Sequence, residues 1–423
     1  MKKFNKNIIL FIVCFLIVAF GFNKPYFESL ADSAKDFSAQ IKEVGIFSAF
    51  DAFTADIEDA STVKIAYHNA LMDINSIKDN LLNTRIITKG EDTIIKTDSG
   101  SLVKAQGYIS DSELDTVVEK IQKLYTFTKN SDAKFLYVAA PQKGYGVSLP
   151  KNADDYRTEN TDRFLSKMQH AEIPTLNLIE KLTDQNIMSE DLFFVTDHHW
   201  TPNTAFWANA QICNTLNEYY GFKFNEQFNN LKNYNIKTYK NHFLGSYGKK
   251  TGTYFARGGA DDIDIITPNF ETKLIEEQPI KSQIRSGDFT QTVMYMENVE
   301  GKDYYAKNPY AAYCGGDFRL QIVKNELNPD GDKILLIRDS YACAVAPFLS
   351  LNTSELHITD IRDFGYFVGE KMDMYKYIEE INPDYVIVLY NGVNRLKPQT
   401  VSMNGEPCFS LTKYGEFDNI NLA

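Results

Sequence analysis

From residue 110 onward, short apolar runs alternate with stretches in which apolar residues recur every three or four positions. The short runs are typical of buried strands, and the three-to-four spacing is typical of amphipathic helices. The clearest apolar runs are Lys134–Ala140, Lys333–Arg338, Glu355–Ile361 and Tyr385–Tyr390. Near-continuous apolar strands that alternate with helices predict an α/β fold with a mainly parallel sheet.

Two helix starts are marked by capping residues. Ser110 and Glu113 have the spacing of a capping box, and apolar residues follow at helical spacing. Thr201 precedes Pro202, whose fixed φ suits the first position of a helix, so a helix should begin there with Thr201 as its N-cap. Because proline also favours extended geometry in the residue before it, the segment that leads to Thr201 is expected to be extended.

The same patterns divide the chain into parts. Residues 1–25 hold an N-terminal membrane anchor or signal peptide, and residues 26–109 are interpreted as a stalk or helical lead-in. The main domain spans residues 110–423. Between about residues 222 and 330 the alternation dissolves into sequence rich in Asn, Lys, Tyr and Gly, which we interpret as an irregular, β-rich insertion.

The N-terminus has the pattern of an export signal. Lys2, Lys3 and Lys6 precede an uninterrupted apolar stretch from Ile8 to Phe22. As a helix this stretch would cover about 22 Å, which is short of the ~30 Å hydrocarbon core and by itself favours a signal peptide. However, no small-x-small cleavage site follows it, which favours an anchor that is not cleaved. We therefore expect an uncleaved anchor, with a cleaved signal peptide as the alternative. The lysines stay in the cytoplasm, so residue 26 onward is expected to be extracytoplasmic.

Composition excludes several classes of protein. The chain has 423 residues, 43% hydrophobic and 24% charged, which suits a folded and mostly soluble body. A formal net charge of −12 argues against a nucleic-acid partner, because such proteins neutralise phosphates with Lys and Arg. The five cysteines show no zinc spacing, and we expect neither a disulfide nor a cofactor.

The most informative segment for chemistry is Asp197-His198-His199-Trp200, directly before the helix that starts at Pro202. In an extended segment residues i and i+2 point the same way, so Asp197 should face His199, with His198 on the other side. A carboxylate beside an imidazole fixes its tautomer and stabilises the imidazolium, as a general base requires. An exposed loop with a capping aspartate is the structural alternative.

A nucleophile candidate comes later in the chain. Ser340 follows the apolar run Lys333–Arg338 and opens a stretch of small residues that should be helical, Tyr341–Leu351. In open α/β sheets ligands bind at the carboxyl ends of strands, and the free N–H groups of a helix start stabilise an oxyanion. Asp197, His199 and Ser340 together supply a Ser/His/Asp triad. An ordinary N-cap serine is the alternative for Ser340.

The histidine segment and the serine segment together resemble a known group of proteins. Asp-x-His-Trp, with a later strand ending in Asp-Ser, resembles the SGNH-hydrolase-like proteins that O-acetylate bacterial exopolysaccharides, such as the alginate O-acetyltransferase proteins. The doubled histidine is similar to the bacterial DHHW-motif family. Supporting matches are Val138–Lys143 with Leu149-Pro150, and Phe243–Gly248. The resemblance covers about residues 110–395.

The resemblance implies an SGNH-like three-layer fold with a permuted motif order, in which the histidine segment precedes the serine. It implies that Asp197 orients His199, that His199 activates Ser340, and that Ser340 carries the acyl group. It further implies a cell-envelope glycan as substrate and a membrane-bound O-acyltransferase as the source of acetyl groups. Arg338 departs from the family pattern, since it stands where the Gly of a Gly-Asp-Ser block would be.

Four further residues are candidates for shaping the substrate pocket: His198, Trp200, Tyr341 and Asn391. Asn391, just after the last strand, is also a candidate oxyanion donor, although a plain Asn-Gly turn explains it as well. We therefore expect an exported serine-dependent O-acyltransferase or acetylesterase acting on a cell-envelope polysaccharide, tethered to the membrane through its N-terminal segment.

Two other classes stay open. A catalytically silent glycan-binding or envelope-assembly protein would keep the fold without the chemistry, which the departure at Arg338 allows. A metal-dependent phosphoesterase is suggested by the Asp-His-His run, since Asp and His are common ligands. The nearest additional acidic cluster, Asp261-Asp262-Ile-Asp264, is interpreted as a solvated acidic turn. We therefore expect no metal.

Overall fold

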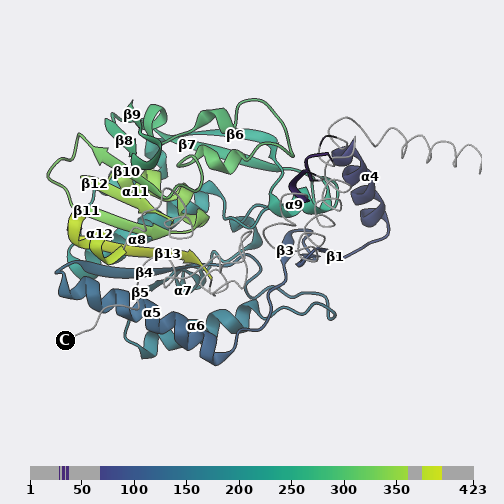
Figure 1. The fold of residues 1–423 in the computed structure, drawn as a ribbon, viewed down its shortest axis with the longest axis horizontal. Coiled ribbons are helices and arrows are strands. Elements are labelled where there is room, and N and C mark those ends of the chain that lie inside the picture. The colour runs from purple at the N-terminus through teal and green to yellow at the C-terminus, as the bar shows by residue number, and fades with distance from the viewer. Residues whose placement is uncertain (1–27, 29–30, 34, 38–66, 361–373, 393–423) are drawn as a thin grey trace, which may run out of the picture. The chain divides into compact units, whose positions relative to one another are not determined.

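The computed structural model describes residues 28, 31–33, 35–37, 67–360 and 374–392 (Figure 1). The chain forms two compact units, residues 1–82 and residues 83–423. In the first unit the longest described element is helix α4 (His68–Leu81).

An eight-stranded sheet forms the centre of this unit. Its strand order is β5-β4-β13-β11-β12-β10-β8-β9, and the first five strands are mutually parallel. Their bounds are β5 (Thr175–Asn177), β4 (Lys134–Ala140), β13 (Tyr385–Asn391), β11 (Lys333–Arg338) and β12 (Glu355–Thr359). The prediction of a mainly parallel α/β sheet is confirmed.

The insertion extends this sheet. Three antiparallel strands from it, β10 (Leu320–Asn325), β8 (Leu274–Gln278) and β9 (Gln283–Gly287), continue the sheet beyond β12. A second, two-stranded sheet pairs β6 (Tyr234–Phe243) with β7 (Asp261–Pro268), and a short helix, α10 (Phe289–Thr292), follows β9. The insertion is β-rich as predicted, and most of it belongs to the same folded body as the parallel strands.

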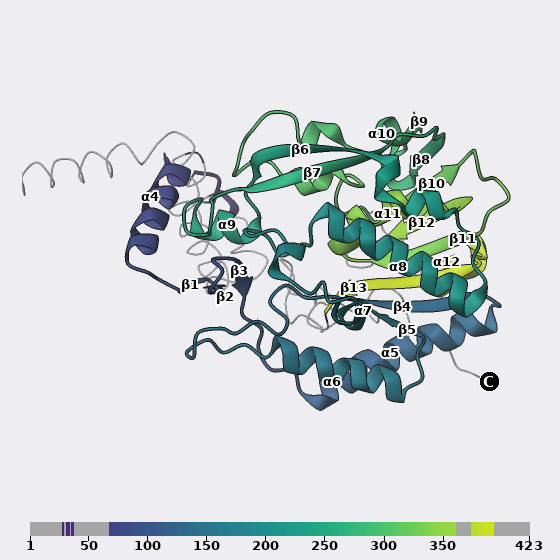
Figure 2. The same cartoon turned by 180° about the vertical axis from the view of Figure 1, so that it is seen from behind.

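Helices cover both faces of the parallel strands, which gives three layers (Figure 2). On one face, α5 (Asp111–Asn130), α6 (Arg157–His170) and α12 (Met374–Ile381) pack against alternate strand residues such as Phe135 and Val386. On the other, α7 (Leu178–Asp184), α8 (Pro202–Tyr220) and α11 (Ala346–Ser350) pack against the intervening residues, such as Leu136 and Ile387. Burial of both strand faces explains why these strands are apolar throughout.

Both predicted helix starts are confirmed. The side chain of Ser110 accepts a hydrogen bond from the Glu113 N–H, and the Glu113 carboxylate accepts one from the Ser110 N–H at 2.8 Å, which completes a capping box at the start of α5. At the start of α8 the Thr201 hydroxyl accepts from the Thr204 N–H at 3.3 Å, with Pro202 in the first turn.

The stalk or helical lead-in expected over residues 26–109 contains helix α4 and, after it, a small sheet. Residues 86–104 form a three-stranded antiparallel sheet, β1 (Ile86–Lys89), β2 (Asp92–Lys96) and β3 (Leu102–Lys104). Ile94 and Leu102 in this small sheet pack against Phe255 and Ala256 in a core of their own. The larger unit thus includes residues that precede the boundary expected near residue 110.

Among the helices in the described ranges, none is both long and apolar enough to span a membrane, and the apolar stretch from Ile8 to Phe22 lies outside those ranges. Cys213, Cys314 and Cys343 are buried free thiols, while Cys14 and Cys408 also lie outside the described residues.

Candidate active site

The Asp-His-His-Trp segment forms a tight loop directly before α8. Phe193 and Trp200 pair across its base as an isolated antiparallel bridge, and the Phe194 N–H donates to the His199 carbonyl at 3.1 Å. Residues 195–199 between them form successive bends instead of an extended strand. This local geometry makes one expectation wrong: His198 lies beside His199, with ring centroids 3.8 Å apart, and does not face the other side.

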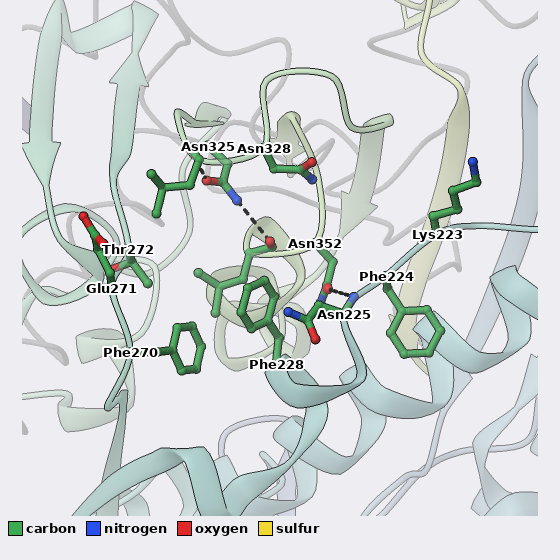
Figure 3. Close-up of a pocket in the computed structure, with 12 residues that line it drawn as sticks. Lys223, Phe224, Asn225, Phe228, Phe270, Glu271, Thr272, Asn325, Asn328 and Asn352 are labelled. Atoms are coloured by element: carbon green, nitrogen blue, oxygen red, sulfur yellow. Dashed lines mark hydrogen bonds between the residues drawn. The ribbon is translucent and has the colours of Figure 1, made fainter.

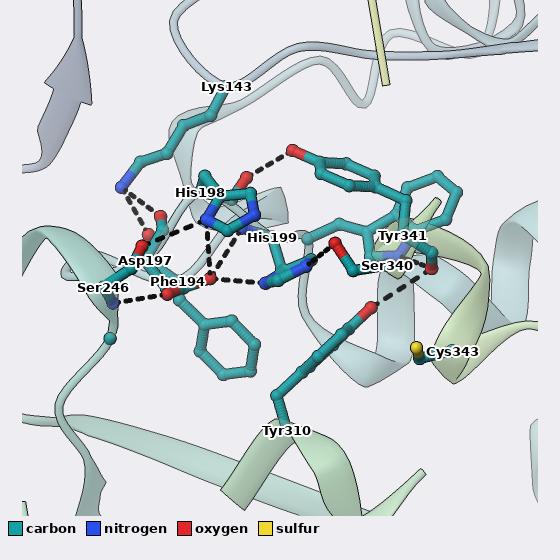
Figure 4. Close-up of polar contacts among 12 residues, drawn as sticks. Lys143, Phe194, Asp197, His198, His199, Ser246, Tyr310, Ser340, Tyr341 and Cys343 are labelled. Atoms are coloured by element: carbon teal, nitrogen blue, oxygen red, sulfur yellow. Dashed lines mark hydrogen bonds and ion pairs between the residues drawn. The ribbon is translucent and has the colours of Figure 1, made fainter. Parts of the chain in front are cut away.

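Asp197 and His199 are paired as predicted. The buried Asp197 carboxylate lies 2.5 Å from His199 Nδ1 and also accepts from the His199 backbone N–H at 3.0 Å (Figure 4). Its second oxygen accepts at 2.6 Å from the N–H of Ser246, the first residue of α9 (Ser246–Thr251). An acceptor at Nδ1 fixes the proton there, so that Nε2 of the neutral imidazole is the basic nitrogen.

The Asp197 carboxylate is held in its ionised form. Burial by itself would raise its pKa, but His198 and His199 beside it, together with the Ser246 N–H, hold the pKa of Asp197 well below its usual value. A buried carboxylate that stays charged at neutral pH stabilises an imidazolium next to it.

The structure brings Ser340 to the other nitrogen of the imidazole. Ser340 Oγ lies 2.7 Å from His199 Nε2, although the two residues are 141 positions apart in the chain. Ser340 begins a short 3₁₀ helix, Ser340–Ala344, two residues after the carboxyl end of β11, and its side chain is partly exposed. The result is a continuous hydrogen-bonded chain from Asp197 through His199 to Ser340.

Asp339 fixes the turn that carries Ser340. Its two carboxylate oxygens accept from the backbone N–H groups of Tyr341 and Asn391, each at 3.0 Å, and its own N–H donates to the Leu389 carbonyl at 3.2 Å. It therefore joins the serine turn to the end of the neighbouring strand β13. The sequence interpretation gave Asp339 no role, although its place between the strand and Ser340 was a usable signal.

Two of the predicted pocket residues are fully buried. The Trp200 indole N–H donates to the Tyr341 carbonyl at 3.0 Å, and the Tyr341 hydroxyl donates to the His198 carbonyl. These contacts connect the histidine loop to the serine turn. His198 and Asn391 are the two partly exposed members of the predicted set. The Asn391 side-chain oxygen has no hydrogen-bond partner among the described residues.

Tyr310 is a member of the site that no sequence motif indicated. Its ring stacks on the His199 imidazole, with centroids 4.2 Å apart and an interplanar angle of 18°, while His198 covers another side of the imidazole. Its hydroxyl donates to the Tyr341 carbonyl at 3.1 Å, and burial raises the pKa of Tyr310 well above its usual value. The neutral phenol thus limits the freedom of the His199 ring to rotate.

Arg338, the departure from the family pattern, is fully buried. Its guanidinium donates to the Asp317 carboxylate at 2.6 Å and to the Gly316 carbonyl at 2.8 Å. The Arg338 side chain is therefore held by the segment that precedes β10. Asp339 and Ser340 still form the turn described above.

The donor atoms of Asp197, His198 and His199 lie within 4.8 Å of one another, the one such grouping of metal-ligating side chains within the described residues. Both nitrogens of His199 already have partners, however, since Asp197 occupies Nδ1 and Ser340 occupies Nε2. A metal ion bound through His199 would have to displace one of them.

The acidic cluster that was interpreted as a solvated turn is in fact part of strand β7. Asp261 accepts from the Val195 and Thr196 N–H groups, at 2.6 and 2.8 Å, and Asp262 pairs with Lys240 at 2.6 Å. These carboxylates have separate partners and do not complete a metal site with the histidines.

A separate cavity of about 410 Å³ is lined by residues from other parts of the chain, which Figure 3 shows. Its lining includes Leu351 and Asn352, just before the amino end of β12, whereas Ser340 follows the carboxyl end of the parallel strand β11. The stacked rings of Phe228 and Phe270 fill one side of it. No member of the predicted triad contributes to this cavity.

Comparison with known proteins agrees with this fold. The sequence model of a family described as "SGNH hydrolase-like domain, acetyltransferase AlgX" matches residues 105–240, which include Asp197 and His199. No curated protein sequence matches the chain.

Solved structures of at least two other proteins share the fold. PatB1 from Bacillus cereus, also determined with a sulfonyl adduct, is 22% identical with a TM-score of 0.58, and the match covers 72% of this chain and 97% of PatB1. A DHHW family protein from Eubacterium siraeum is 17% identical with a TM-score of 0.53, covering 73% of this chain and 93% of that protein. The predicted resemblance and the SGNH-like fold are confirmed.

Proposed function

We propose that the protein is an exported, serine-dependent O-acetyltransferase that acts on a cell-envelope polysaccharide. The observation that carries this proposal is the hydrogen-bonded chain from Asp197 to His199 and Ser340, with 2.5 and 2.7 Å between the reacting heteroatoms. A partly exposed serine hydroxyl with a base on one side, and a carboxylate behind that base, is the arrangement that acyl transfer requires.

The reaction proceeds in two balanced steps. Ser340 Oγ attacks the carbonyl carbon of an acetyl ester while His199 Nε2 takes the hydroxyl proton, and the donor alcohol then leaves with that proton. The acetyl group remains on Ser340 as an ester. An acceptor hydroxyl gives its proton to His199 and attacks this ester, and Ser340 Oγ departs and regains the proton. Asp197 stabilises the imidazolium that forms in both steps.

The carbonyl oxygen that becomes negative in each step needs hydrogen-bond donors. Asn391 is the candidate in the described residues, because its backbone is bonded to Asp339, the residue directly before the nucleophile. His198 is the candidate for contact with the substrate, since it is the partly exposed member of the Asp197–Trp200 segment.

The acetyl group is supported by the matched family, whose description is an acetyltransferase. The polysaccharide substrate is carried over from the resemblance to the proteins that O-acetylate bacterial exopolysaccharides. The basic and apolar N-terminal sequence supports an extracytoplasmic, membrane-anchored protein, or a secreted one if that segment is cleaved. Acetyl-CoA is not available there, so the acetyl donor would come from a membrane-bound O-acyltransferase. The proposed chemistry needs no cofactor of the chain's own.

The experiment that tests this function follows acetyl transfer from a small acetyl ester to envelope oligosaccharides by mass spectrometry, with the Ser340→Ala variant as the blank. We expect acetylated oligosaccharide with the unmodified chain and none with the variant. Release of free acetate without transfer would favour an acetylesterase. Glycan binding with neither reaction would favour the silent, assembly-protein alternative.

A further inference from the structure

A buried lysine lies behind the loop that presents Asp197. Lys143 follows β4, and its ammonium group donates three hydrogen bonds to backbone carbonyls of the loop (Figure 4). The acceptors are Phe194 at 2.6 Å, Val195 at 2.8 Å and Asp197 at 2.9 Å. An ammonium has three donors, so all of them are used on this one short segment.

A carboxylate holds the N–H groups of the same segment. Asp261, the first residue of β7, accepts from the Val195 and Thr196 N–H groups and from the Thr196 hydroxyl, at 2.6, 2.8 and 2.5 Å. Thr196 in turn accepts through its hydroxyl from the Gly245 N–H at 2.8 Å. In the backbone of residues 194–197, carbonyl groups therefore accept hydrogen bonds from the Lys143 ammonium, and N–H groups donate to the Asp261 carboxylate.

We infer that Lys143 and Asp261 are positioning residues for the proposed reaction, because they fix the loop backbone that sets the Asp197 carboxylate against His199. This inference rests on the proposed function. The Lys143 ammonium bonds directly to the carbonyl of Asp197, so movement of the loop on loss of that bond is transmitted to the residue whose side chain orients the base.

The burial of Lys143, together with the partial burial of Asp261, argues for a specific role. Removing charged groups from water costs free energy, and apolar side chains of similar volume fill such space at less cost. Burial lowers the pKa of Lys143 to about 7, while Asp261, Asp197 and Glu190 oppose that shift. Burial also raises the pKa of Asp261, against the hydrogen bonds from Thr196 and Val195. Each charge thus favours the ionised form of the other.

The inference is tested by the rate at which a sulfonyl fluoride labels Ser340 in the full-length chain. In this reaction Ser340 Oγ bonds to sulfur, fluoride leaves, and His199 accepts the hydroxyl proton, so the rate reports how well the base is placed. Lys143→Met and Asp261→Asn should each label about 10- to 100-fold more slowly, since misplacement of a reacting group by ~1 Å costs about that much. Ser340→Ala gives the blank.

Matched controls separate loop positioning from general damage. Lys134→Met changes an exposed lysine at the opposite end of the same strand, and Asp262→Asn changes the next residue of β7. Both should label within about 2-fold of the unmodified chain. A second readout is the low-field proton resonance of His199 Nδ1–H, which depends on the Asp197 hydrogen bond and should shift in Lys143→Met and Asp261→Asn but not in the controls.

The possible outcomes are distinguishable. Labelling at the unmodified rate by both Lys143→Met and Asp261→Asn would overturn the inference. If the unmodified chain itself shows no Ser340-dependent labelling, the proposed function fails. The His199 Nδ1–H resonance then tests the inference on its own. An unchanged resonance in both Lys143→Met and Asp261→Asn would overturn the inference. Should Lys143→Met not fold, Lys143→Gln and Asp261→Asn carry the same test.

Discussion

The indole N–H of Trp200 donates to the backbone carbonyl of Tyr341 at 3.0 Å, and so joins the loop that carries His199 to the turn that carries Ser340. The same carbonyl accepts the Tyr310 hydroxyl at 3.1 Å. Trp200 follows the proposed base His199 in the chain, and the Tyr310 ring stacks on the His199 imidazole. The 2.7 Å approach of His199 to Ser340 is therefore set by buried contacts that lie outside the predicted triad.

The first prediction concerns that indole bond. Trp200→Phe keeps an aromatic ring in the core but removes the donor, and it should slow hydrolysis of a chromogenic acetyl ester by about 10-fold, the equivalent of one buried hydrogen bond. Trp207→Phe is the matched control, because Trp207 is a partly exposed residue whose indole donates to Gln185. Equal losses in both variants would contradict a specific role for the Trp200 contact.

The second prediction concerns Gly245, which lies against the backbone of Asp197. A Cβ on Gly245 would be 2.2 Å from Asp197 Cβ and 2.6 Å from its Cα, far closer than non-bonded carbon atoms approach one another in proteins. Gly245→Ala must displace Asp197 or its neighbours, and ester hydrolysis should fall at least 100-fold. At Gly107 an added Cβ meets nothing within 4 Å, so Gly107→Ala should retain full activity. Normal activity of Gly245→Ala would show that Asp197 need not hold this position.

The third prediction separates the two neighbouring histidines. Asp197→Asn should lower kcat by about 10⁴, because an amide allows the wrong imidazole tautomer at His199. His198→Ala should cost less than about 10-fold, since His198 Nδ1 lies 3.1 Å from Ser246 Oγ, whereas it is His199 Nε2 that lies against Ser340 Oγ. The comparison is made by steady-state ester hydrolysis. A larger loss in His198→Ala than in Asp197→Asn would reverse the proposed roles.

The fourth prediction is a pH dependence of stability. The pKa of Lys143 is lowered from 10.5 to about 7, chiefly by burial and slightly by Arg157, against the carboxylates of Asp261, Asp197 and Glu190. Between these two values the unfolded chain binds more protons at this position than the folded chain, so the Lys143 contribution to the free energy of unfolding increases with pH. The slope is at most roughly 1.4 kcal/mol per pH unit.

Urea unfolding at pH 7, 8 and 9 measures this slope. Lys143→Met should show a smaller rise in unfolding free energy over this range than the unmodified chain, because the methionine does not titrate. Lys134→Met, an exposed position, should keep the unmodified slope. Parallel curves for the unmodified chain and Lys143→Met would contradict a depressed lysine pKa.

Local patterns predicted the elements that hold the site. The capping residues Ser110 and Thr201 and the apolar run before Ser340 each act over a few positions, and each element formed where expected. The pairing of Asp197 with His199 was also predictable, because both lie on one short segment. The convergence of that segment with Ser340 followed from the resemblance and from the rule that sites form at the carboxyl ends of parallel strands.

Other features depend on contacts distant in sequence. The side of His198 was mispredicted because the loop is bent and its backbone is hydrogen-bonded to Lys143 and Asp261, which are distant in sequence and give no local signal. The strands β1–β3 are only three to five residues long, so any periodicity in them was too short to recognise. Tyr310 lies in the insertion, and only the fold of the insertion brings its ring onto His199. No sequence motif marks Tyr310.

The most direct test of the account is hydrolysis of a chromogenic acetyl ester by the full-length chain, with trapping of the acetyl-enzyme by acid quench and mass spectrometry. The account predicts one acetyl group on Ser340, and loss of both acetylation and turnover in Ser340→Ala and His199→Ala. If the unmodified chain is no faster than Ser340→Ala and no acetyl-Ser340 is found, with acetylated oligosaccharides also unreactive, the proposed triad chemistry is contradicted.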